Sequence, residues 1–433
     1  MSGATALTGV GTGPRLLAGL GNGQRLDLAA HLEIHGPVTS LRTRRRAEHP
    51  LIEAIAEAGV RGRGGAGFPT ASKLRAVKAA GRRPVVVING SEGEPLSQKD
   101  TLLLLRTPHL VLDGAAAVAE ALGAKEVVVY LHRGREAVER SVQAAIRERD
   151  DASLFTLVAG PARYVAGESS AVANFLSGGP AIPTTTPPRV SERGVGGRPT
   201  MLSNAETYAH IGLVARHGPE WFRTVGTASE PGTLLLTITG AVQAPGVVEV
   251  PFGTLISTAL ELAGGVSDAS VGYLLGGYAG TWMRPEIAND LALASMVMRE
   301  RRAGIGVGLI AVLPQAACVL AETANIMRWL ANESARQCGP CLNGLPAIAE
   351  ATEALATGRV DEFVLGKLER WARMVEGRGS CHHPGGAVQT LRSALDTFAD
   401  HTNQHLMSGP CSQAHRTWLA IPAVPTGPDA DFR

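Results

Sequence analysis

The chain has 433 residues, of which 45% are hydrophobic and 18% are charged, so it can bury several hydrophobic cores, and its length predicts about three domains. Its formal net charge is only +2, which gives no electrostatic reason to expect nucleic acid or an anionic membrane as the partner. Residues 1–20 lack the cationic start and apolar core of a signal peptide, and no segment approaches the roughly 20 apolar residues of a membrane-spanning helix. We therefore expect a cytoplasmic protein that reaches any membrane only through a partner.

The N-terminal half has the alternating pattern of an α/β domain, preceded by a lead-in over residues 1–45 that we expect to be flexible. Six segments have the composition of a regular element: helices at 51–60, 70–78, 110–122 and 135–149, and strands at 85–88 and 126–131. The strands are short β-branched runs with a helix between them, which is the order of a parallel sheet. We therefore predict one α/β domain over residues 46–228.

The composition changes after residue 232. Residues 234–250 read LLLTITGAVQAPGVVEV, which is two β-rich runs around a Gln-Ala-Pro-Gly turn, and a helical pattern over 254–262 follows. This order predicts a small β-grasp domain over residues 229–303.

The C-terminal part is expected to be helical. One more strand, 306–313, precedes helical patterns that continue to about residue 401, so residues 304–405 are predicted to form a helical domain. The proline-rich tail, residues 406–433, is expected to be poorly ordered.

A glycine-rich segment lies between the first two predicted helices. Residues 61–70 read RGRGGAGFPT, and Gly62, Gly64 and Gly67 fit the dinucleotide fingerprint G-x-G-x-x-G. That fingerprint must follow a strand, whereas this one follows an amphipathic helix, so a Rossmann site is disfavoured. The glycines still allow backbone N–H groups to approach a ligand, and Lys73 lies in the first turns of the next helix. We expect a cradle for a phosphate or a ring, with an arginine-rich surface turn as the alternative.

Polar residues follow the predicted strand 85–88. They are Asn89, Ser91, Glu92 and Glu94, and then the pair Lys99 and Asp100. Ligands of α/β sheets bind beyond the carboxyl ends of the strands, so the first four are placed where a cofactor would bind. For Lys99 and Asp100 we prefer a solvated loop that carries a salt bridge.

Four ordered motifs resemble those of a known family. They read GVRGRGGAGFPTASKL (59–74), NGSEGEPLSQKD (89–100), YVAGESSAVANFLSGGPAIP (164–183) and GRPTMLSNAETYAHI (197–211). Together with a C-terminal cysteine motif, they make residues 45–400 similar to the flavoprotein subunit of respiratory complex I and its relatives in NAD-reducing hydrogenases and formate dehydrogenases. The resemblance implies an FMN-binding α/β sandwich domain with a β-grasp insert and a C-terminal helical iron–sulfur domain.

The resemblance also implies a set of site residues. The FMN phosphate and isoalloxazine would be held by Gly62, Gly64, Gly65, Ala66, Gly67 and Lys73. The rest of the pocket would come from Asn89, Tyr164, Gly167, Glu168, Asn204 and Thr207. Glu92 and Glu94 match acidic positions beside bound NADH and are the candidate catalytic residues. Residues 274–282 of the β-grasp domain are expected near the cofactors.

The nucleotide subsite departs from the family pattern. Phe68 remains, but Ala76 and Arg189 replace two aromatic residues that stack on the adenine. A stacked aromatic ring contributes about 1–3 kcal/mol per base, so NADH binding is expected to be weaker. Arg189 can instead stack on the ring or pair with a phosphate, and both NADH and NADPH remain candidates. Ser169 and Ser203 also make the predicted pocket less acidic than the family pattern.

Three cysteines have the spacing of metal ligands. Cys338 and Cys341 form C-x-x-C, and Cys381 follows in SCHHPGGA; the odd number of five cysteines favours reduced thiols over disulfides. The spacing leaves an iron–sulfur cluster and a Cys3His zinc site equally open. The resemblance implies a 4Fe–4S cluster, although Ala335 occupies the first cysteine position, and a 3Fe–4S cluster is the variant. Candidates for the fourth ligand are Ser334, Gln337, His382, solvent or another thiol.

The remaining cysteine and histidine residues receive no site. We expect Cys318 to be a buried structural thiol and His401 and His405 to be surface residues, and we assign no role to Cys411 and His415. The predicted function is NAD(P)H oxidation through FMN and one cluster to a ferredoxin or a thioredoxin-like iron–sulfur subunit. One alternative is an electron relay between FMN and a ferredoxin-type partner without nicotinamide oxidation, and another is a scaffold subunit with a zinc site.

Overall fold

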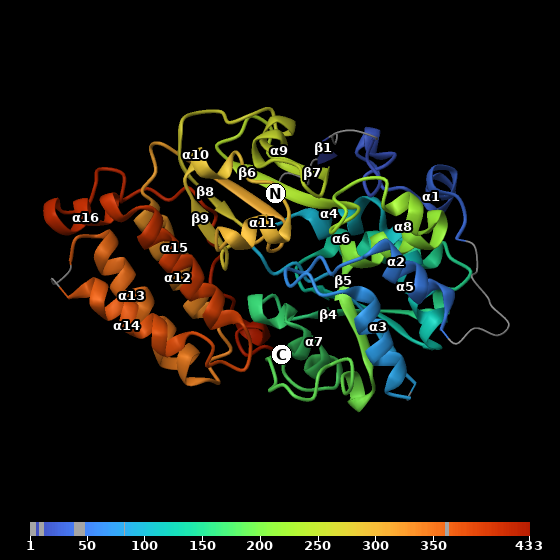
Figure 1. Ribbon diagram of the computed structural model, residues 1–433. Helices are drawn as coiled ribbons and strands as arrows, with labels where there is room; N and C mark the ends of the chain where they lie inside the picture. Colours follow the sequence, from blue (N-terminus) through green and yellow to red (C-terminus); the bar gives the residue numbers. More distant parts are fainter. Residues whose placement is uncertain (1–5, 8–12, 39–47, 82, 360–362) are drawn as a thin grey trace.

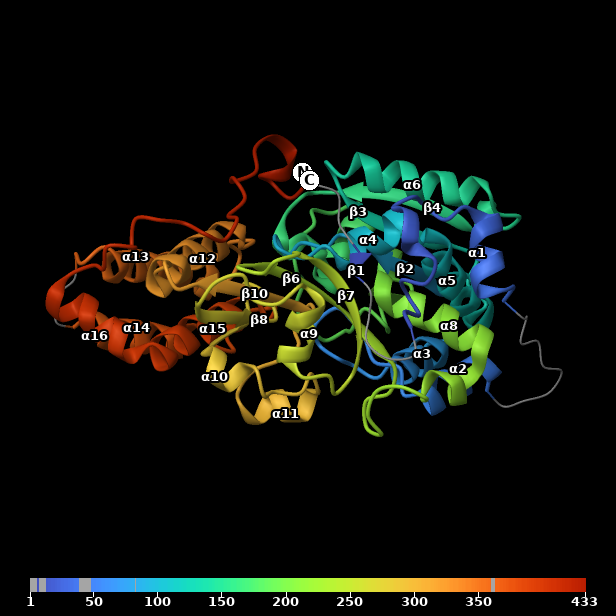
Figure 2. The ribbon, with the colours of Figure 1, turned by 90° about the horizontal axis from the view of Figure 1, so that it is seen from above.

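The computed structural model describes residues 6–7, 13–38, 48–81, 83–359 and 363–433. An α/β domain, a second sheet with its own helices and a bundle of helices follow one another along the molecule (Figure 1). The view from above has the same order (Figure 2). The predicted fold class, an α/β domain with a β insert and a C-terminal helical domain, is confirmed.

Four parallel strands form the sheet of the α/β domain, in the order β4-β3-β2-β5. The strands are β2 (Val85–Asn89), β3 (Val127–His132), β4 (Phe155–Gly160) and β5 (Thr200–Asn204). The α-helices are α2 (Pro50–Ala58), α3 (Thr70–Ala79), α4 (Lys99–Arg106), α5 (Pro108–Leu122), α6 (Glu136–Arg147), α7 (Ser169–Leu176) and α8 (Ala205–Phe222). Three 3-10 helices complete the domain: η2 (Ala152–Leu154), η3 (Tyr164–Gly167) and η4 (Val195–Gly197).

Both faces of the central strand β2 are covered. Val86 and Ile88 belong to one core, which they share with residues of α2, α3, α5 and α8. Val85 and Val87 belong to a second core, which includes Val172 of α7. A strand that is buried on both faces needs apolar residues at successive positions, which explains its unbroken β-branched sequence.

The segment before the α/β domain packs onto the protein, contrary to the flexible lead-in expected for residues 1–45. It contains β1 (Ala6–Leu7), η1 (Leu20–Asn22) and α1 (Leu28–His35). One oxygen of the Glu249 carboxylate accepts the backbone N–H groups of Arg15, Leu16 and Leu17 at 2.8, 2.9 and 3.1 Å, and both leucines are buried. The Glu249 carboxylate is therefore one of the groups that hold this segment, while residues 1–5, 8–12 and 39–45 lie outside the described ranges.

The second sheet has the order β1-β7-β6-β10-β8-β9. Its further strands are β6 (Thr233–Gly240), β7 (Gly246–Pro251), β8 (Ser270–Leu275), β9 (Thr281–Met283) and β10 (Leu309–Pro314), and its helices are α9 (Ile256–Leu262), α10 (Pro285–Ala288) and α11 (Ser295–Glu300). The strand β10 pairs in parallel with β6 and antiparallel with β8. This sheet therefore extends past the domain boundary that was expected at residue 303. The sequence pattern of β10 indicates that it is a strand but does not indicate with which strands it pairs.

The C-terminal part is a helical bundle beside this sheet (Figure 1). Its elements are α12 (Val319–Glu333), the π-helix η5 (Pro340–Gly344), α13 (Leu345–Ala356), α14 (Val364–Val375), α15 (His383–Thr397) and α16 (Ala399–Ser408), with the 3-10 helix η6 (Gly427–Asp429) near the end of the chain. A contact between α15 and the sheet joins the two parts, since the backbone N–H of Trp282 in β9 donates to the Ser393 hydroxyl at 2.9 Å.

The tail after α16 is bound to the rest of the protein, contrary to the poorly ordered tail expected for residues 406–433. It returns from the bundle to the α/β domain (Figure 2). The Glu322 carboxylate accepts the backbone N–H groups of Trp418 and Leu419 at 2.7 and 3.1 Å. Near the chain end, the Arg163 guanidinium lies 4.2 Å from the ring centre of Phe432. Few apolar residues are needed to hold an extended chain in this way, so composition gave no sign of it.

Within the described ranges, no single helix has the length and apolar composition needed to cross a membrane, and the two helices α4 and α5 meet that requirement only as a pair with a bend of 93° between them.

Candidate functional site

The glycine-rich loop lies between α2 and α3 and is closed by its own backbone. The N–H of Gly62 donates to the carbonyl oxygen of Phe68 at 2.9 Å, and Arg61 and Pro69 form an antiparallel bridge. The next backbone N–H, that of Arg63, donates to the hydroxyl of Thr207 on α8 at 2.9 Å. The loop is thus attached to the first turn of the helix that follows β5.

Two glycines of the loop have backbone angles that favour glycine. Gly65 has a φ of 105° and Gly67 a φ of 59°, a region that side-chain-bearing residues rarely enter. A Cβ atom added to Gly67 would meet no protein atom within 4 Å, and one added to Gly64 would lie 3.5 Å from the Asn204 side chain. The loop therefore presents bare backbone to open space beside the end of β5.

The ends of β2 and β5 are neighbours, since Asn89 and Asn204 are paired in register. The Asn89 amide donates to the carbonyl oxygen of Gly167 at 2.8 Å, which places η3 against the end of β2. A Cβ atom on Gly167 would lie 2.6 Å from the Ser91 hydroxyl, so a larger residue here would force the Ser91 side chain to turn. The following residue, Glu168, accepts the backbone N–H groups at the start of α7 and caps that helix.

The two candidate catalytic carboxylates have different surroundings. Glu92 accepts hydrogen bonds from the Ser97 hydroxyl and from the backbone N–H groups of Asp100 and Thr101, so it caps the start of α4. Glu94 accepts the N–H of Tyr278 in the second sheet's domain at 3.0 Å, while its other oxygen is buried without a partner among the described residues. Burial raises the pKa of Glu94 to about 8 against the opposing effect of that N–H. Glu94 is therefore mainly protonated at neutral pH.

Lys99 and Asp100 are buried, and the solvated loop predicted for them is wrong. They begin α4, where the Lys99 ammonium lies 2.9 Å from both the Asp100 and the Glu206 carboxylates. It also donates to the Asn204 side-chain oxygen at 3.1 Å, and the Asn204 amide donates to Asp100 at 2.6 Å. Burial alone would lower the pKa of Lys99, but the two carboxylates raise it. The predicted salt bridge is present, and it orients the Asn204 amide.

The other predicted ligands lie around the loop. Lys73 donates to the carbonyl oxygen of Leu202 in β5 at 3.0 Å, and burial lowers its pKa. Phe68 has 45% of its surface exposed, and Ala76 and Arg189 are exposed as well. An aromatic surface is thus available at Phe68, whereas Ala76 offers none.

The three predicted cysteine ligands come together in one cavity. Its lining consists of Cys338, Cys341 and Cys381 together with Val165, Pro183, Ala335, Arg336, Gln337, Gly379, Ser380 and His383. The Cys338 sulfur lies 3.2 Å from the Ser380 hydroxyl. Burial, and then the neighbouring cysteines, raise the pKa of Cys341 to about 12, so metal binding there must displace a proton.

The structure narrows the candidates for a fourth ligand. The Ser334 hydroxyl is directed to the carbonyl oxygen of Ala331, and His382 does not line the cavity, whereas His383 does. The Nε2 atom of His383 bonds the carbonyl oxygen of Leu330 at 2.8 Å, and its Nδ1 atom is buried without a partner in the described part of the chain. His383 follows Cys381 so closely in the sequence that the pattern alone did not separate it from His382.

The short helix η3 connects the two sites. At its end, the Gly167 carbonyl bonds Asn89 beside the loop. At its start, the Tyr164 ring centre lies 5.6 Å from that of His383 and 5.2 Å from that of Trp329 on α12. Tyr164 therefore contacts the helical bundle, and burial raises its pKa. The residue predicted as a wall of the flavin pocket thus contacts His383, which lines the cysteine cavity, and the next residue, Val165, lines that cavity itself.

Comparison with known sequences identifies the family. Over 389 residues the chain is 31% identical to the F subunit of the NADH-quinone oxidoreductase of Salmonella typhimurium, and the match covers 83% of this chain and 87% of that protein. The chain belongs to the family of NADH-quinone oxidoreductase F subunits. The F subunit of Escherichia coli strain K12 matches with the same identity and coverage. The resemblance inferred from the four motifs is therefore confirmed.

Separate family models match each of the three parts of the chain. Residues 55–213 match the Nuo51 FMN-binding domain, 235–273 the SLBB domain, and 321–405 the NADH-ubiquinone oxidoreductase-F iron-sulfur binding region. The predicted FMN and iron–sulfur domains are confirmed by these matches.

Solved structures show the same arrangement. The NAD+-reducing NiFe hydrogenase in its air-oxidised state matches with a TM-score of 0.80 and 28% identity, over 97% of this chain and 70% of that chain. Its H2-reduced state matches with a TM-score of 0.76 over 84% of this chain, and here the match spans 63% of the length of that chain. The overall fold of this chain is thus shared with a chain of that hydrogenase.

Proposed function

We propose that this chain oxidises a nicotinamide dinucleotide at FMN and passes the electrons through one iron–sulfur cluster to a protein acceptor. The observation that carries the proposal is the position of η3, whose two ends contact the loop-side Asn89 and the cysteine-side His383. One short helix that contacts residues of both sites brings those sites close together, which favours electron transfer between them. The relatives among the F subunits and the hydrogenase match support the same chemistry.

The residues at the loop fit FMN. Bare backbone at Gly64, Gly65 and Gly67 leaves room for a flat ring, and Lys73 supplies a cation at the start of the next helix. The network of Lys99, Asp100 and Glu206 fixes Asn204 at the edge of this space. FMN would supply the ability to accept a hydride and to release electrons singly. The chain's own part is to hold the ring and to exclude water from it.

The cysteine cavity fits an iron–sulfur cluster with three thiolate ligands. Ala335 lines the cavity at the position of the missing cysteine, so one corner of the cluster would have no thiolate from this chain. Such a site holds a 4Fe–4S cluster with a different ligand at that corner, or a 3Fe–4S cluster. His383 Nδ1, the Ser380 hydroxyl and the side-chain oxygen of Gln337 belong to residues that line the cavity and have lone pairs for that corner.

For the nucleotide, we propose Phe68 and Arg189 as the residues that contact the adenosine part. Glu94 would act on the nicotinamide side through the loop that follows β2, which its buried carboxylate holds against Tyr278. Glu92 already accepts three hydrogen bonds and would act by holding this loop in place. Both NADH and NADPH are donors to be tested.

A second candidate function is electron relay between FMN and a ferredoxin-type protein without nicotinamide oxidation. It is favoured by the exposed Ala76 and Arg189, which replace aromatic residues of the family pattern. The relatives named above are subunits of larger enzymes, so a protein partner is expected in either case. We propose a ferredoxin or a thioredoxin-like iron–sulfur subunit as that partner, with the chain acting in the cytoplasm.

Anaerobic purification followed by rapid mixing separates these functions. The protein should be yellow-brown and contain FMN and iron, and low micromolar NADH or NADPH should bleach the flavin absorbance before the cluster signal appears. Bleaching by a reduced ferredoxin but by neither nucleotide would support the relay instead. A colourless protein that takes up no FMN and carries zinc at Cys338 and Cys381 would refute both functions and leave the scaffold alternative.

A further inference from the structure

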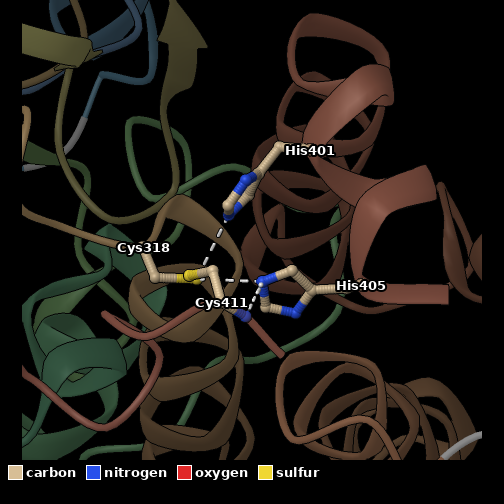
Figure 3. A group of neighbouring side chains, drawn as sticks. All are labelled: Cys318, His401, His405 and Cys411. Atoms are coloured by element: carbon tan, nitrogen blue, oxygen red, sulfur yellow. Dashed lines mark hydrogen bonds between the residues drawn. The ribbon is translucent and has the colours of Figure 1, made fainter. Parts of the chain in front are cut away.

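Four side chains outside both sites converge at the far end of the helical bundle (Figure 3). They are Cys318, His401, His405 and Cys411, and one ligand atom from each lies within 4.8 Å of all the others. The Cys318 sulfur is 3.4 Å from the Nε2 atom of His401 and 3.7 Å from that of His405. His405 is buried, so the surface position predicted for it is wrong, while Cys318 is buried as expected.

Three separate segments supply these residues. Cys318 precedes the first turn of α12, and its sulfur accepts the N–H of Ala321 at 3.4 Å. His401 and His405 are four residues apart on one face of α16, and Cys411 follows the end of that helix. No sequence motif joins position 318 to the other three, so only folding brings the set together.

The spacing matches a single tetrahedral ion. With metal–sulfur bonds of about 2.3 Å and metal–nitrogen bonds of about 2.0 Å, a tetrahedral site separates sulfur and nitrogen by about 3.5 Å. The two distances from Cys318, 3.4 and 3.7 Å, lie on either side of that value. In a two-iron cluster, by contrast, two ligands bind each iron, so the sulfur atoms on one iron would lie farther from the nitrogen atoms on the other than these distances allow. We propose that Cys318, His401, His405 and Cys411 bind one structural zinc ion.

The surroundings orient the ligands. The Nδ1 atom of His405 lies 3.4 Å from the carbonyl oxygen of Leu355, and donation there leaves the lone pair on Nε2, the nitrogen that faces the cysteines. That Nε2 atom accepts the N–H of Cys411 at 3.2 Å, a contact that the ion would replace. Two thiolates and two neutral imidazoles balance the charge of Zn2+, which suits a buried site with no open position.

The ion would fasten the tail to the bundle. Residues 318 and 411 belong to the start of α12 and to the tail, and the tail then continues to the Glu322 contacts with Trp418 and Leu419. Farther along, the Tyr278 hydroxyl donates to the carbonyl oxygen of Ala420 at 2.7 Å. Zinc would therefore hold α16 and the tail on the helix that also carries Trp329 beside Tyr164. This role is independent of the electron-transfer function.

Metal analysis of the full chain, purified anaerobically with FMN and iron, tests the proposal. The wild type should carry one zinc besides its iron, and X-ray absorption at the zinc edge should give a shell of two sulfur and two nitrogen neighbours. Cys411→Ser should lose the zinc and keep iron and FMN. Cys338→Ser is the matched control, which should lose iron and keep zinc. Cys411→His, which retains a ligand, should restore zinc binding.

Limited trypsin digestion supplies a readout that needs no variant of the buried Cys318. Cleavage after the exposed Arg416 should become about 10-fold faster or more when zinc is removed by a chelator, because the tail opens more often. Retention of zinc in Cys411→Ser but not in Cys338→Ser would place the zinc in the other cysteine site and overturn the proposal. A wild-type chain that binds no zinc, even when zinc is added to the protein, would overturn it equally.

Discussion

The backbone N–H of Tyr278 donates a hydrogen bond of 3.0 Å to the carboxylate of Glu94, and the second oxygen of that carboxylate is buried with no partner in the described part of the chain. The bond links the domain of the second sheet to the loop that follows β2. Glu94 is buried, and a Cβ atom added to Gly277 would lie 2.6 Å from the same carboxylate, so the group is packed closely against this turn. Its protonation state is therefore coupled to the packing of the two domains.

This coupling predicts a pH effect. The pKa of Glu94 is raised by burial to about 8 in the folded protein, from an ordinary value of 4.5, so its contribution to stability is fully present below pH 4.5 and is lost as the pH rises to about 8. Glu94→Gln cannot ionise. The melting temperature of this variant relative to that of the wild type should rise between pH 5 and pH 7.5, for a gain of about 3 kcal/mol in the relative free energy of unfolding. Thermal melts of the apoprotein measure this. Glu261→Gln changes an exposed residue on α9 and is the control: its melting temperature should depend on pH as that of the wild type does. The same pH dependence for Glu94→Gln and the wild type would contradict the raised pKa of Glu94.

Gly67 and Gly123 provide a matched pair for the FMN proposal. Both have a positive φ, 59° and 69°, and a Cβ atom added to either meets no protein atom within 4 Å. Alanine at either position should therefore cost a similar 1–2 kcal/mol, roughly the cost of a left-handed residue. Gly67→Ala alone should also weaken FMN binding, by about tenfold or more, which corresponds to about 1.4 kcal/mol. Fluorescence titration of the apoprotein with FMN measures the dissociation constant of each variant. Equal FMN dissociation constants for the two variants would show that FMN does not bind at this loop.

Ala335→Cys should complete the thiolate set of the cysteine cavity. If the wild-type cluster has one corner without a thiolate, as proposed, it should retain about three irons per chain after brief exposure to air, whereas the variant should retain about four. Iron analysis and electron paramagnetic resonance measure the change. Ser334→Cys is the control, because that neighbouring side chain is directed to the Ala331 carbonyl instead of the cavity. If both variants gain iron equally, Ala335 is not at the open corner.

Removing Glu206 should destabilise the protein strongly. Its buried carboxylate pairs with Lys99 at 2.9 Å and accepts the N–H of Leu235 in β6 at 2.9 Å, so Glu206→Gln leaves the Lys99 ammonium with less compensation. We expect a loss of about 3–5 kcal/mol in the free energy of unfolding, measured by urea denaturation. The half-exposed pair of Arg328 and Glu353 is the comparison, where Glu353→Gln should change stability by no more than about 0.5 kcal/mol. Similar losses of unfolding free energy in the two variants would mean that the buried ion pair contributes no more to stability than the half-exposed one.

Local patterns were enough to predict much of the fold. The helices that begin near Leu51 and Thr70 and the β-branched strands of the α/β sheet follow from periodicity and from the need to bury both faces of a parallel sheet. The four motifs and the C-x-x-C spacing identified the family for the same reason, since a loop and a pair of thiols are encoded by residues close in sequence. The three cysteines predicted as ligands also line one cavity.

Contacts between distant residues could not be inferred in this way. The burial of Lys99 depends on Glu206, the contact of Tyr164 with His383 crosses from one domain to another, and the group around Cys318 joins segments more than eighty residues apart. Pairing, burial and ligation of this kind depend on which surfaces meet when the domains pack. Composition and spacing specify the elements and the chemistry that each one carries, while their partners are set by the three-dimensional packing of the whole chain.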